Sequence, residues 1–553
     1  MSLPDFSTQS ELFSTAGLSG SLFATTDRYR LFAQKVYPAL VRVRPKLEDC
    51  YCADNGRVAM EPILMLGVSL LQYLEAVPDR QAVDLLHYHA GWNFALNRHV
   101  GDELFHPTTL VHFRQRLLDH DLSTIGFEMV LEALVEAGLV ARQSRQRLDS
   151  TQMFGRVSRM SRLDCVRESL RLALQELAEE VPAEGRPAWW LLFWERYVDS
   201  QADYRAPAET LARKMVEAGT DAQQFLAWLA EPPAQEWAQG KQAALLARVF
   251  SEQFEVLASG APQPKTKEQT SSARVQNPHE PEATYAAKGK GEQKKEHVGY
   301  KVQVAETVSE VVLAPGEPTR NFISGIVTHA ALESDQQGFA KMELEQRALG
   351  MDKPPVQYVD AAYISAAKLV EAAAQGRELI GPALASPHNN DGRFVPEQFH
   401  VTVEQGKAVC PAGQENTQCS RLEEQATGKV SYRFEWNSSI CGPCPLRQQC
   451  IKADHAHRTL TVGEHHTTLQ TRRQEQQTKP FQQRMKHRNA IEGTQSELVR
   501  SHGLRRARYR GLAKARLQNY FIGAACNIKR WLRRVAWQWQ RSLTSALATV
   551  TVN

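Results

Sequence analysis

The architecture is set by GYKVQVAET (residues 299–307), followed by SGIVTHA (324–330), PVQYVDAAY (355–363) and RELIGPAL (377–384). These runs alternate apolar and polar residues or are rich in β-branched and aromatic residues, and Gly or Pro bounds them, so each predicts a strand. Between them lie QGFAKMELEQRALG (337–350) and ISAAKLVEAAAQG (364–376), which have a helical period. Strands that alternate with helices predict an α/β core.

The rest of the chain divides around this core. Its 553 residues are too many for one compact domain. Residues 1–145 contain segments with helical spacing and predict an all-α domain. QRLDST (146–151) predicts a strand, and a helical block follows from about 160 to 258. Residues 259–283 are polar, rich in Pro and without periodicity, so they predict a linker.

Beyond the alternating region, residues 400–455 carry a cluster of cysteines and residues 456–540 are again helical. We therefore expect the α/β core to occupy 146–399 and 456–540, with the helical block and the cysteine segment as two insertions. Residues 541–553 are left as a tail.

Composition excludes several classes of protein. Hydrophobic residues make up 42% of the chain and charged residues 23%, which is ordinary for globular proteins and excludes wholesale disorder. The longest apolar stretch (60–76) is interrupted by Gln72 and Glu75 and is too short to span a membrane. The N-terminal stretch carries acids where a secretory signal carries bases. These features predict a cytoplasmic protein with no membrane partner.

Positive charge is concentrated in one block. The net charge of the chain is only +4, but residues 481–540 hold fourteen Lys or Arg against two acids, Glu492 and Glu497. A basic block on a mildly acidic body is typical of a protein that binds a polyanion. A solvated basic helix is the alternative interpretation.

Three acids could carry chemistry. Asp149 ends the predicted strand QRLD, Asp360 ends PVQYVD, and Glu492 lies in the predicted helix 482–503. Acids at strand ends face the cleft where open α/β sheets bind ligands, and three converging carboxylates suit a pair of Mg²⁺ ions. A single Asp at a strand end is more often a cap or turn residue. Asp164 and Asp335 are rival acids in helical or loop contexts.

Four segments carry a resemblance to a known family: LDST (148–151), residues 282–307, VQYVDAAYIS (356–365) and residues 488–531. They resemble the DDE transposases of bacterial insertion sequences, in the branch with a Tyr-Arg-Glu-Lys signature around the last carboxylate. The resemblance implies an RNase H-like catalytic core, a mixed sheet flanked by helices. It matches Asp149, Asp360 and Glu492 to the catalytic triad that binds two Mg²⁺ or Mn²⁺ ions.

The same resemblance implies the activity and the partners. It implies metal-dependent strand cleavage at transposon ends and strand transfer, with double-stranded DNA (terminal inverted repeats and target DNA) as partner. It further implies a homodimer or larger assembly on DNA, in the bacterial cytoplasm at the nucleoid.

The chain departs from the signature at two positions. Met485 and Val499 stand where family members carry Tyr and Lys. At about 100° per helical residue, Arg488 and position 499 flank Glu492, where a cation would grip phosphate. Val499 cannot do this, and Arg500 is the candidate substitute. The departures favour the alternative function, a catalytically impaired protein that still binds transposon ends.

Two further groups of residues are candidates for binding. Arginines in LRRARYRGL (504–512) directly follow the Glu492 helix and predict phosphate contacts; they are Arg505, Arg506, Arg508 and Arg510.

CGPC places Cys441 and Cys444 at the spacing that zinc favours, and Cys410 and Cys450 would complete a structural four-thiolate site, with Cys419 as the alternate. Reduced buried thiols are the competing interpretation. Trp436, in the same segment, is predicted to pack rather than to stack on a DNA base.

Overall fold

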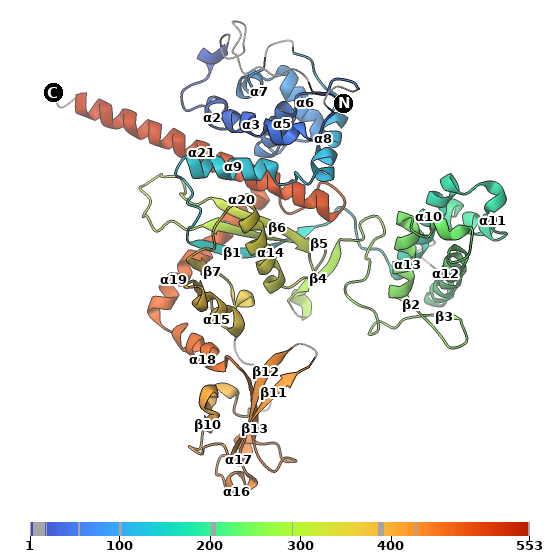
Figure 1. Ribbon diagram of the computed structural model, residues 1–553, viewed down its shortest axis with the longest axis vertical. Helices are drawn as coiled ribbons and strands as arrows, with labels where there is room; N and C mark the ends of the chain where they lie inside the picture. The colour runs from blue at the N-terminus through green and yellow to red at the C-terminus, as the bar shows by residue number, and fades with distance from the viewer. Residues whose placement is uncertain are drawn as a thin grey trace.

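The centre of the molecule is a six-stranded mixed sheet (Figure 1). The computed structural model describes residues 2–3, 17, 19–52, 56–98, 102–200, 206–289, 291–384, 392–425 and 428–550. The strands are β1 (Gln146–Phe154), β4 (Thr284–Lys288), β5 (Lys295–Thr307), β6 (Ile323–Ala330), β7 (Val356–Tyr358) and β8 (Glu378–Ile380). Their order is β4-β5-β1-β7-β8, and β6 also pairs with β5. The predicted α/β core is therefore present.

The sheet changes direction at β1. Strand β5 runs antiparallel to β1, β4 and β6, whereas β1–β7 and β7–β8 are parallel. The parallel crossovers are made by α14 (Asp335–Ala348) and α15 (Ala366–Ala374), as the sequence pattern predicts. These helices cover one face of the sheet, with Leu148, Phe339 and Tyr363 buried between the layers.

The N-terminal helices cover the other face together with the long C-terminal helix. They are α2 (Arg28–Lys35), α3 (Tyr37–Arg42), α4 (Arg44–Glu48), α5 (Pro62–Leu74), α6 (Asp79–Tyr88), α7 (Ala90–Ala95), α8 (Thr108–Asp119) and α9 (Ile125–Glu136). Helix α21 (Leu512–Val550) runs between them and the sheet, so Leu66, Phe127, Tyr300, Ile326 and Phe521 share one apolar core. The all-α region expected over 1–145 thus has no core separate from that of the sheet.

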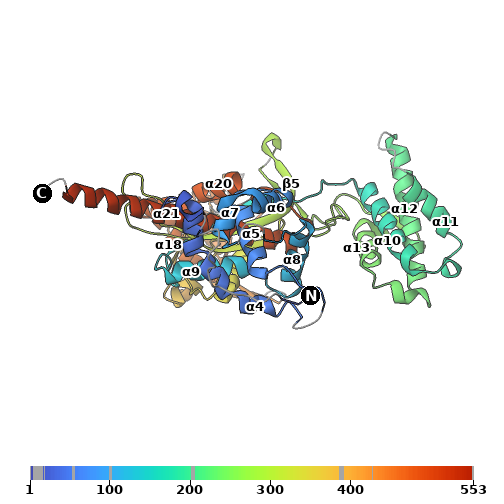
Figure 2. The same ribbon diagram turned by 90° about the horizontal axis from the view of Figure 1, so that it is seen from above.

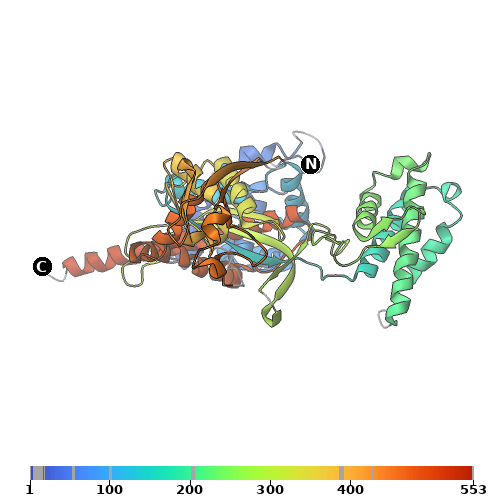
Figure 3. The same ribbon diagram turned by 90° about the horizontal axis from the view of Figure 1, so that it is seen from below.

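The helical insertion has its own core and stands apart from the sheet in all three views (Figures 1, 2 and 3). It contains α10 (Arg162–Glu180), α11 (Trp190–Phe193), a π-helical turn (Trp194–Asp199), α12 (Ala208–Leu229), α13 (Lys241–Gln253), β2 (Phe254–Val256) and β3 (Pro262–Pro264). Phe193, Phe225 and Leu246 are buried at its centre.

The predicted linker 259–283 is only partly a linker. It begins with β3, and Val275, Gln276 and Asn277 are buried. Glu280 is 1% exposed and accepts hydrogen bonds from Tyr300 Oη (2.8 Å) and from the backbone N–H of Arg156 (2.8 Å). A polar segment can be buried in this way because its charged group has one partner in the sheet and one in the chain just after β1.

The cysteine-bearing segment forms a small β unit at the opposite end from the N-terminal helices (Figure 1). It contains β9 (His400–Thr402), β10 (Lys407–Val409), β11 (Gln418–Glu424), β12 (Lys429–Glu435), β13 (Thr459–Gly463), α16 (Ser438–Cys441) and α17 (Arg447–Cys450). Trp436 is 1% exposed, lies against Phe399 and donates from Nε1 to the Gln414 carbonyl at 2.9 Å. The predicted packing role of Trp436 is confirmed.

Three helices return the chain from this unit to the sheet: α18 (His466–Glu475), α19 (Lys479–Asn489) and α20 (Ile491–His502). The single helix predicted over 482–503 is therefore wrong, since α19 ends and α20 begins around Ala490. No helix in the described ranges is long and apolar enough to cross a membrane.

Candidate active site

Asp149 lies on β1, whereas Asp360 lies two residues beyond the end of the neighbouring parallel strand β7, where it caps a short 3₁₀ helix (Ala361–Tyr363) instead of ending the strand. Gln146 of β1 faces Gln357 of β7, and Arg147 faces Tyr358, so two residues further on Asp149 stands beside Asp360. The sequence predicted that Asp149 ends its strand. Instead β1 continues to Phe154, because its pairing with β5 continues after that with β7 has stopped. The two aspartates therefore mark the notch where β1 and β7 separate, a usual ligand position in α/β sheets.

Arg488 contacts all three predicted carboxylates. Its Nη2 lies 2.9 Å from Asp149 Oδ2 and 3.5 Å from Asp360 Oδ2, and its Nη1 lies 3.4 Å from Glu492 Oε1. Although α19 and α20 are separate helices, Ala490 between them has helical dihedral angles (φ −64°, ψ −13°). The i,i+4 contact between Arg488 and Glu492 is therefore kept. The three acids meet around one guanidinium group.

The acids differ in their exposure. The Asp149 and Arg488 side chains are each 14% exposed, whereas Asp360 is 52% and Glu492 71% exposed. Burial raises the pKa of Asp149; Arg488 and the N–H of Ser150 oppose this effect, and the negative charge of Asp360 adds to it. One acid is thus held inside and two face the solvent, where a large substrate can reach them.

A fourth carboxylate lies behind Asp149. Asp335, at the start of α14, accepts from Ser150 Oγ at 2.9 Å and lies 3.3 Å from Lys301 Nζ. The rival acid Asp335 is thus part of the surroundings of the site, whereas Asp164 lies at the start of α10 in the helical insertion. Tyr363 is also near: burial raises the pKa of its hydroxyl well above its usual value, and Asp335 adds to this. The hydroxyl stays protonated at neutral pH.

The donor set suits a hard cation. Four carboxylates stand against two cations, Arg488 and Lys301, which leaves excess negative charge that Mg²⁺ or Mn²⁺ would neutralise. The acids Asp149, Asp360 and Glu492 are not gathered to the spacing of a shared metal ion, since the guanidinium lies among them. In the part of the chain that the structure describes, Glu497, His502 and Cys526 are the group of donors within 4.8 Å of one another. Arg530 contacts Glu497, and this positive charge opposes a metal ion there.

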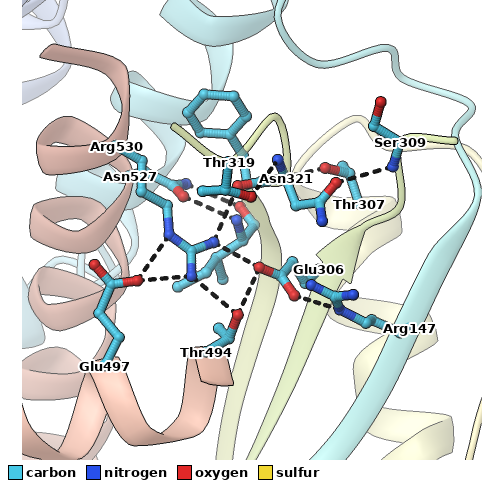
Figure 4. A network of polar contacts seen from close by, with 12 residues as sticks. Arg147, Glu306, Thr307, Ser309, Thr319, Asn321, Thr494, Glu497, Asn527 and Arg530 are labelled. Carbon is cyan, nitrogen blue, oxygen red and sulfur yellow. Dashed lines mark hydrogen bonds and ion pairs between the residues drawn. The ribbon is translucent and has the colours of Figure 1, made fainter. Parts of the chain in front are cut away.

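A buried polar network supports the notch (Figure 4). Glu306 of β5 is 1% exposed; its Oε2 accepts from Arg147 Nε at 2.5 Å and its Oε1 from Arg530 Nη1 at 2.6 Å. Thr494 Oγ1 donates to Glu306 at 2.7 Å, and Arg530 also contacts Glu497 at 2.9 Å. The network therefore ties β1 and β5 to α20 and α21.

This network acts directly on the positions of the site residues. Arg147 precedes Asp149 by two residues on β1, and its Nη1 donates to the His487 carbonyl at 3.1 Å. His487 is the residue before Arg488. The same guanidinium thus fixes the strand that carries Asp149 and the helix end that carries Arg488. Sequence analysis missed Arg147, Glu306 and Arg530, although a charged residue inside a predicted strand was a signal for the first two.

The predicted phosphate-binding arginines have different surroundings. Arg500, Arg506 and Arg510 are exposed, and Arg505 is exposed while donating to the Gln152 carbonyl at 3.2 Å. Arg508 instead donates to the Val77 carbonyl at 3.2 Å and lies over the Tyr73 ring. Arg508 therefore joins the N-terminal helices to the segment after α20.

Half of the basic block faces solvent. The exposed cations are Lys486, Arg500, Arg505, Arg506, Arg510, Lys514 and Arg533. Others are held inside, such as Arg530 with Glu306 and Arg534 with Glu317 (3.2 Å). The two residues that depart from the signature are also packed inward: Met485 against Tyr358 and Ile380, and Val499 against the main core.

Four predicted zinc ligands line one cavity. Cys410, Cys441, Cys444 and Cys450 surround a small space beside Trp436. Burial raises the pKa of Cys450, and the other three cysteines add to this effect. The alternate, Cys419, lies on β11 and is not among the lining residues. No three of these sulfur atoms, all within the described ranges, lie within 4.8 Å of one another. The cysteines therefore face the same cavity but are farther apart than the ligands of one metal ion.

Comparisons with known proteins give two matches. Residues 409–532 match a family described as Transposase DDE domain, and residues 21–116 match one described as Transposase domain (DUF772). The first segment includes the four cysteines of the cavity, Arg488 and Glu492; Asp149 and Asp360 lie outside both segments. No curated protein and no solved structure matches the chain. Two segments are thus similar to transposase domains.

We expect Glu306→Ala to lower the free energy of unfolding by about 3–5 kcal/mol, because it leaves Arg147 and Arg530 buried without the carboxylate between them. Glu310→Ala is the control, since Glu310 forms a half-exposed pair with Arg145 whose loss costs at most about 1 kcal/mol. Scanning calorimetry measures both. An unfolding temperature for Glu306→Ala equal to that of the control would show that the network does not stabilise the sheet.

Proposed function

We propose that this protein is the DNA transposase of an insertion sequence, with Asp149, Asp360 and Glu492 as ligands for two divalent metal ions. The observation that carries the proposal is the convergence of these acids, from three distant segments, around Arg488. The similarity of residues 409–532 to a DDE transposase domain supports it. The mixed sheet, with antiparallel strands on one side of β1 and parallel strands on the other, supports an RNase H-like core.

The proposed mechanism assigns a task to each residue. When bound, two Mg²⁺ ions supply Lewis-acid stabilisation of the attacking and leaving oxygens in phosphoryl transfer. Asp149 provides the buried ligand, while Asp360 and Glu492 face the DNA. With metal ions held by the three carboxylates, Arg488 would be free to turn its guanidinium to the phosphate, since a fork of N–H donors fits phosphate oxygens. Tyr363 stays protonated, so its hydroxyl adds no negative charge beside the carboxylates.

The remaining expectations belong to the same proposal. Residues 1–145 recognise transposon ends, 146–399 and 456–540 form the catalytic core, and the enzyme acts as a dimer or larger assembly on double-stranded DNA in the cytoplasm. The alternative of an impaired end-binding protein rests on Met485 and Val499. Both side chains pack against apolar residues, and Arg488 and the three acids are retained, so the alternative is not favoured.

Each of Asp149→Ala, Asp360→Ala and Glu492→Ala should abolish DNA cleavage and leave DNA binding within about twofold. Removing one ligand disables a shared two-metal clamp, so the three losses should be similar and non-additive. Nicking of a supercoiled plasmid that carries the DNA flanking this coding sequence, with Mg²⁺, measures activity. Asp164→Ala is the control and should cut normally. Full cleavage by Asp149→Ala would remove Asp149 from the site.

Protein purified without chelators should contain about one zinc ion per chain, bound by Cys410, Cys441, Cys444 and Cys450. Atomic absorption measures the content. Cys441→Ser should lose the zinc, whereas Cys419→Ser should retain it because Cys419 lies outside the cavity. Zinc-free wild-type protein would indicate that these are reduced buried thiols.

The salt dependence of DNA affinity tests whether the exposed arginines after α20 contact DNA. With six to eight phosphate contacts, log affinity for duplex DNA should fall against log salt concentration with a slope of about −5 to −7. Replacing Arg505, Arg506 and Arg510 together by Gln should reduce this slope by about two to three. Arg508→Gln is the matched comparison: it should lower the unfolding temperature and leave the slope unchanged. An unchanged slope in the triple variant would show that these three arginines do not contact DNA phosphates.

A further inference from the structure

A second cavity lies at the far end of β1, beyond the acids. It has a volume of about 480 Å³ and its lining includes Phe154, Arg156, Arg159, Tyr285, His297 and Arg506. Phe154 is five residues after Asp149 on the same strand, or roughly 16 Å at about 3.3 Å per residue. It lies on the sheet, away from the cysteine-bearing unit, and the proposed metal chemistry does not use it.

The backbone at this end of β1 is held on both sides. Phe154 pairs with Gly299 of β5, and on its other edge the Phe154 N–H donates to the Arg505 carbonyl while the Ala507 N–H donates to the Phe154 carbonyl, both at 2.9 Å. This pairing places Arg506 beside Phe154. Gly299 is required for it, since a Cβ there would lie 2.1 Å from the Met153 carbonyl oxygen. The cavity is therefore built on rigid backbone.

The floor of the cavity combines an aromatic ring with an unsatisfied imidazole. The Phe154 side chain is 39% exposed, and its ring lies edge to face with His297 at 6.0 Å. His297 is only 6% exposed, and neither of its ring nitrogens makes a hydrogen bond of normal geometry within the described chain. Burial lowers the pKa of His297 more than the nearby Ala286 backbone raises it, so the ring is neutral and offers one donor and one acceptor. A buried polar group without partners is costly, which favours a ligand that supplies them.

The rim is positively charged. Arg156, Arg159 and Arg506 are exposed there. Glu296 is the acid of the lining, and it is paired with Lys294 at 2.5 Å and with Arg159 at 3.9 Å. Arg159 also lies over the Tyr285 ring at 5.1 Å. Phosphate is the group that such a rim attracts.

We propose that this cavity binds an unpaired nucleotide of the DNA substrate. The base stacks on Phe154 and meets the donor and acceptor of His297, and its phosphate lies against Arg156 and Arg506. A base inside a duplex is stacked on its neighbours and cannot enter, so the site selects an unpaired one. At about 3.4 Å per nucleotide the cavity lies roughly five nucleotides from Asp149. This inference rests on the proposed function, because it assumes a DNA substrate.

The test compares two labelled duplexes, one with a single unpaired thymidine and one fully paired, by fluorescence anisotropy. Wild-type protein should bind the first more tightly. Phe154→Leu and His297→Leu should weaken binding to the first by about tenfold, a typical loss for one stacked base, and change binding to the second less than twofold. Phe154→Trp keeps an aromatic face and His297→Gln keeps a donor and an acceptor, so both should retain the preference.

Photo-crosslinking tests the site in the wild-type protein, so its result does not depend on whether the variants fold. With 5-iododeoxyuridine as the unpaired residue, the crosslink should map to Phe154 or Tyr285. Equal affinity of the wild-type protein for both duplexes, or a crosslink confined to other segments, would overturn the nucleotide site and leave the transposase proposal standing. Failure to bind either duplex would overturn both.

Discussion

The Glu306 carboxylate, buried between Arg147 and Arg530, is the interaction on which the rest of the structure depends. A lone buried charge is unstable, so the strand, the two helices and the neighbouring strand that supply its partners must assemble together. This assembly fixes the positions of Asp149 and Arg488, because Arg147 donates both to Glu306 and to the carbonyl of His487, the residue before Arg488. The site is thus positioned from the interior of the sheet.

Charge is arranged in three zones along β1. Inside, Arg147 and Arg530 are balanced by Glu306 and Glu497, which leaves that zone neutral. At the notch carboxylates outnumber cations, and beyond it arginines line the exposed end of the strand. A polyanion laid along β1 would meet the acidic centre at the notch and positive charge at the exposed end of the strand. In the proposed function, metal ions would neutralise the acids at that centre and so allow DNA to bind the same surface.

Sequence reasoning predicted the local elements well and their pairing poorly. Periodicity was enough for β5, β6, α14 and α15, because alternation and helical spacing are local properties. It could not show that β1 runs past Asp149 or that the Glu492 helix breaks near Ala490, since both depend on partners distant in the chain. Arg147 and Glu306 are 159 residues apart, and only the β1–β5 register places them opposite each other. The candidate acids came from a family resemblance, and the register gives their alignment a physical basis.

The central claim is that Asp149, Asp360 and Glu492 bind metal ions together. Iron-dependent cleavage of the protein backbone tests it most directly: Fe²⁺ replaces Mg²⁺, and ascorbate with peroxide then generates hydroxyl radicals that cut the chain close to the ion. The account predicts cuts near residues 149, 360 and 492 that excess Mg²⁺ suppresses and that Asp149→Ala abolishes. Cuts confined to other segments, or cuts that persist in Asp149→Ala, would contradict it.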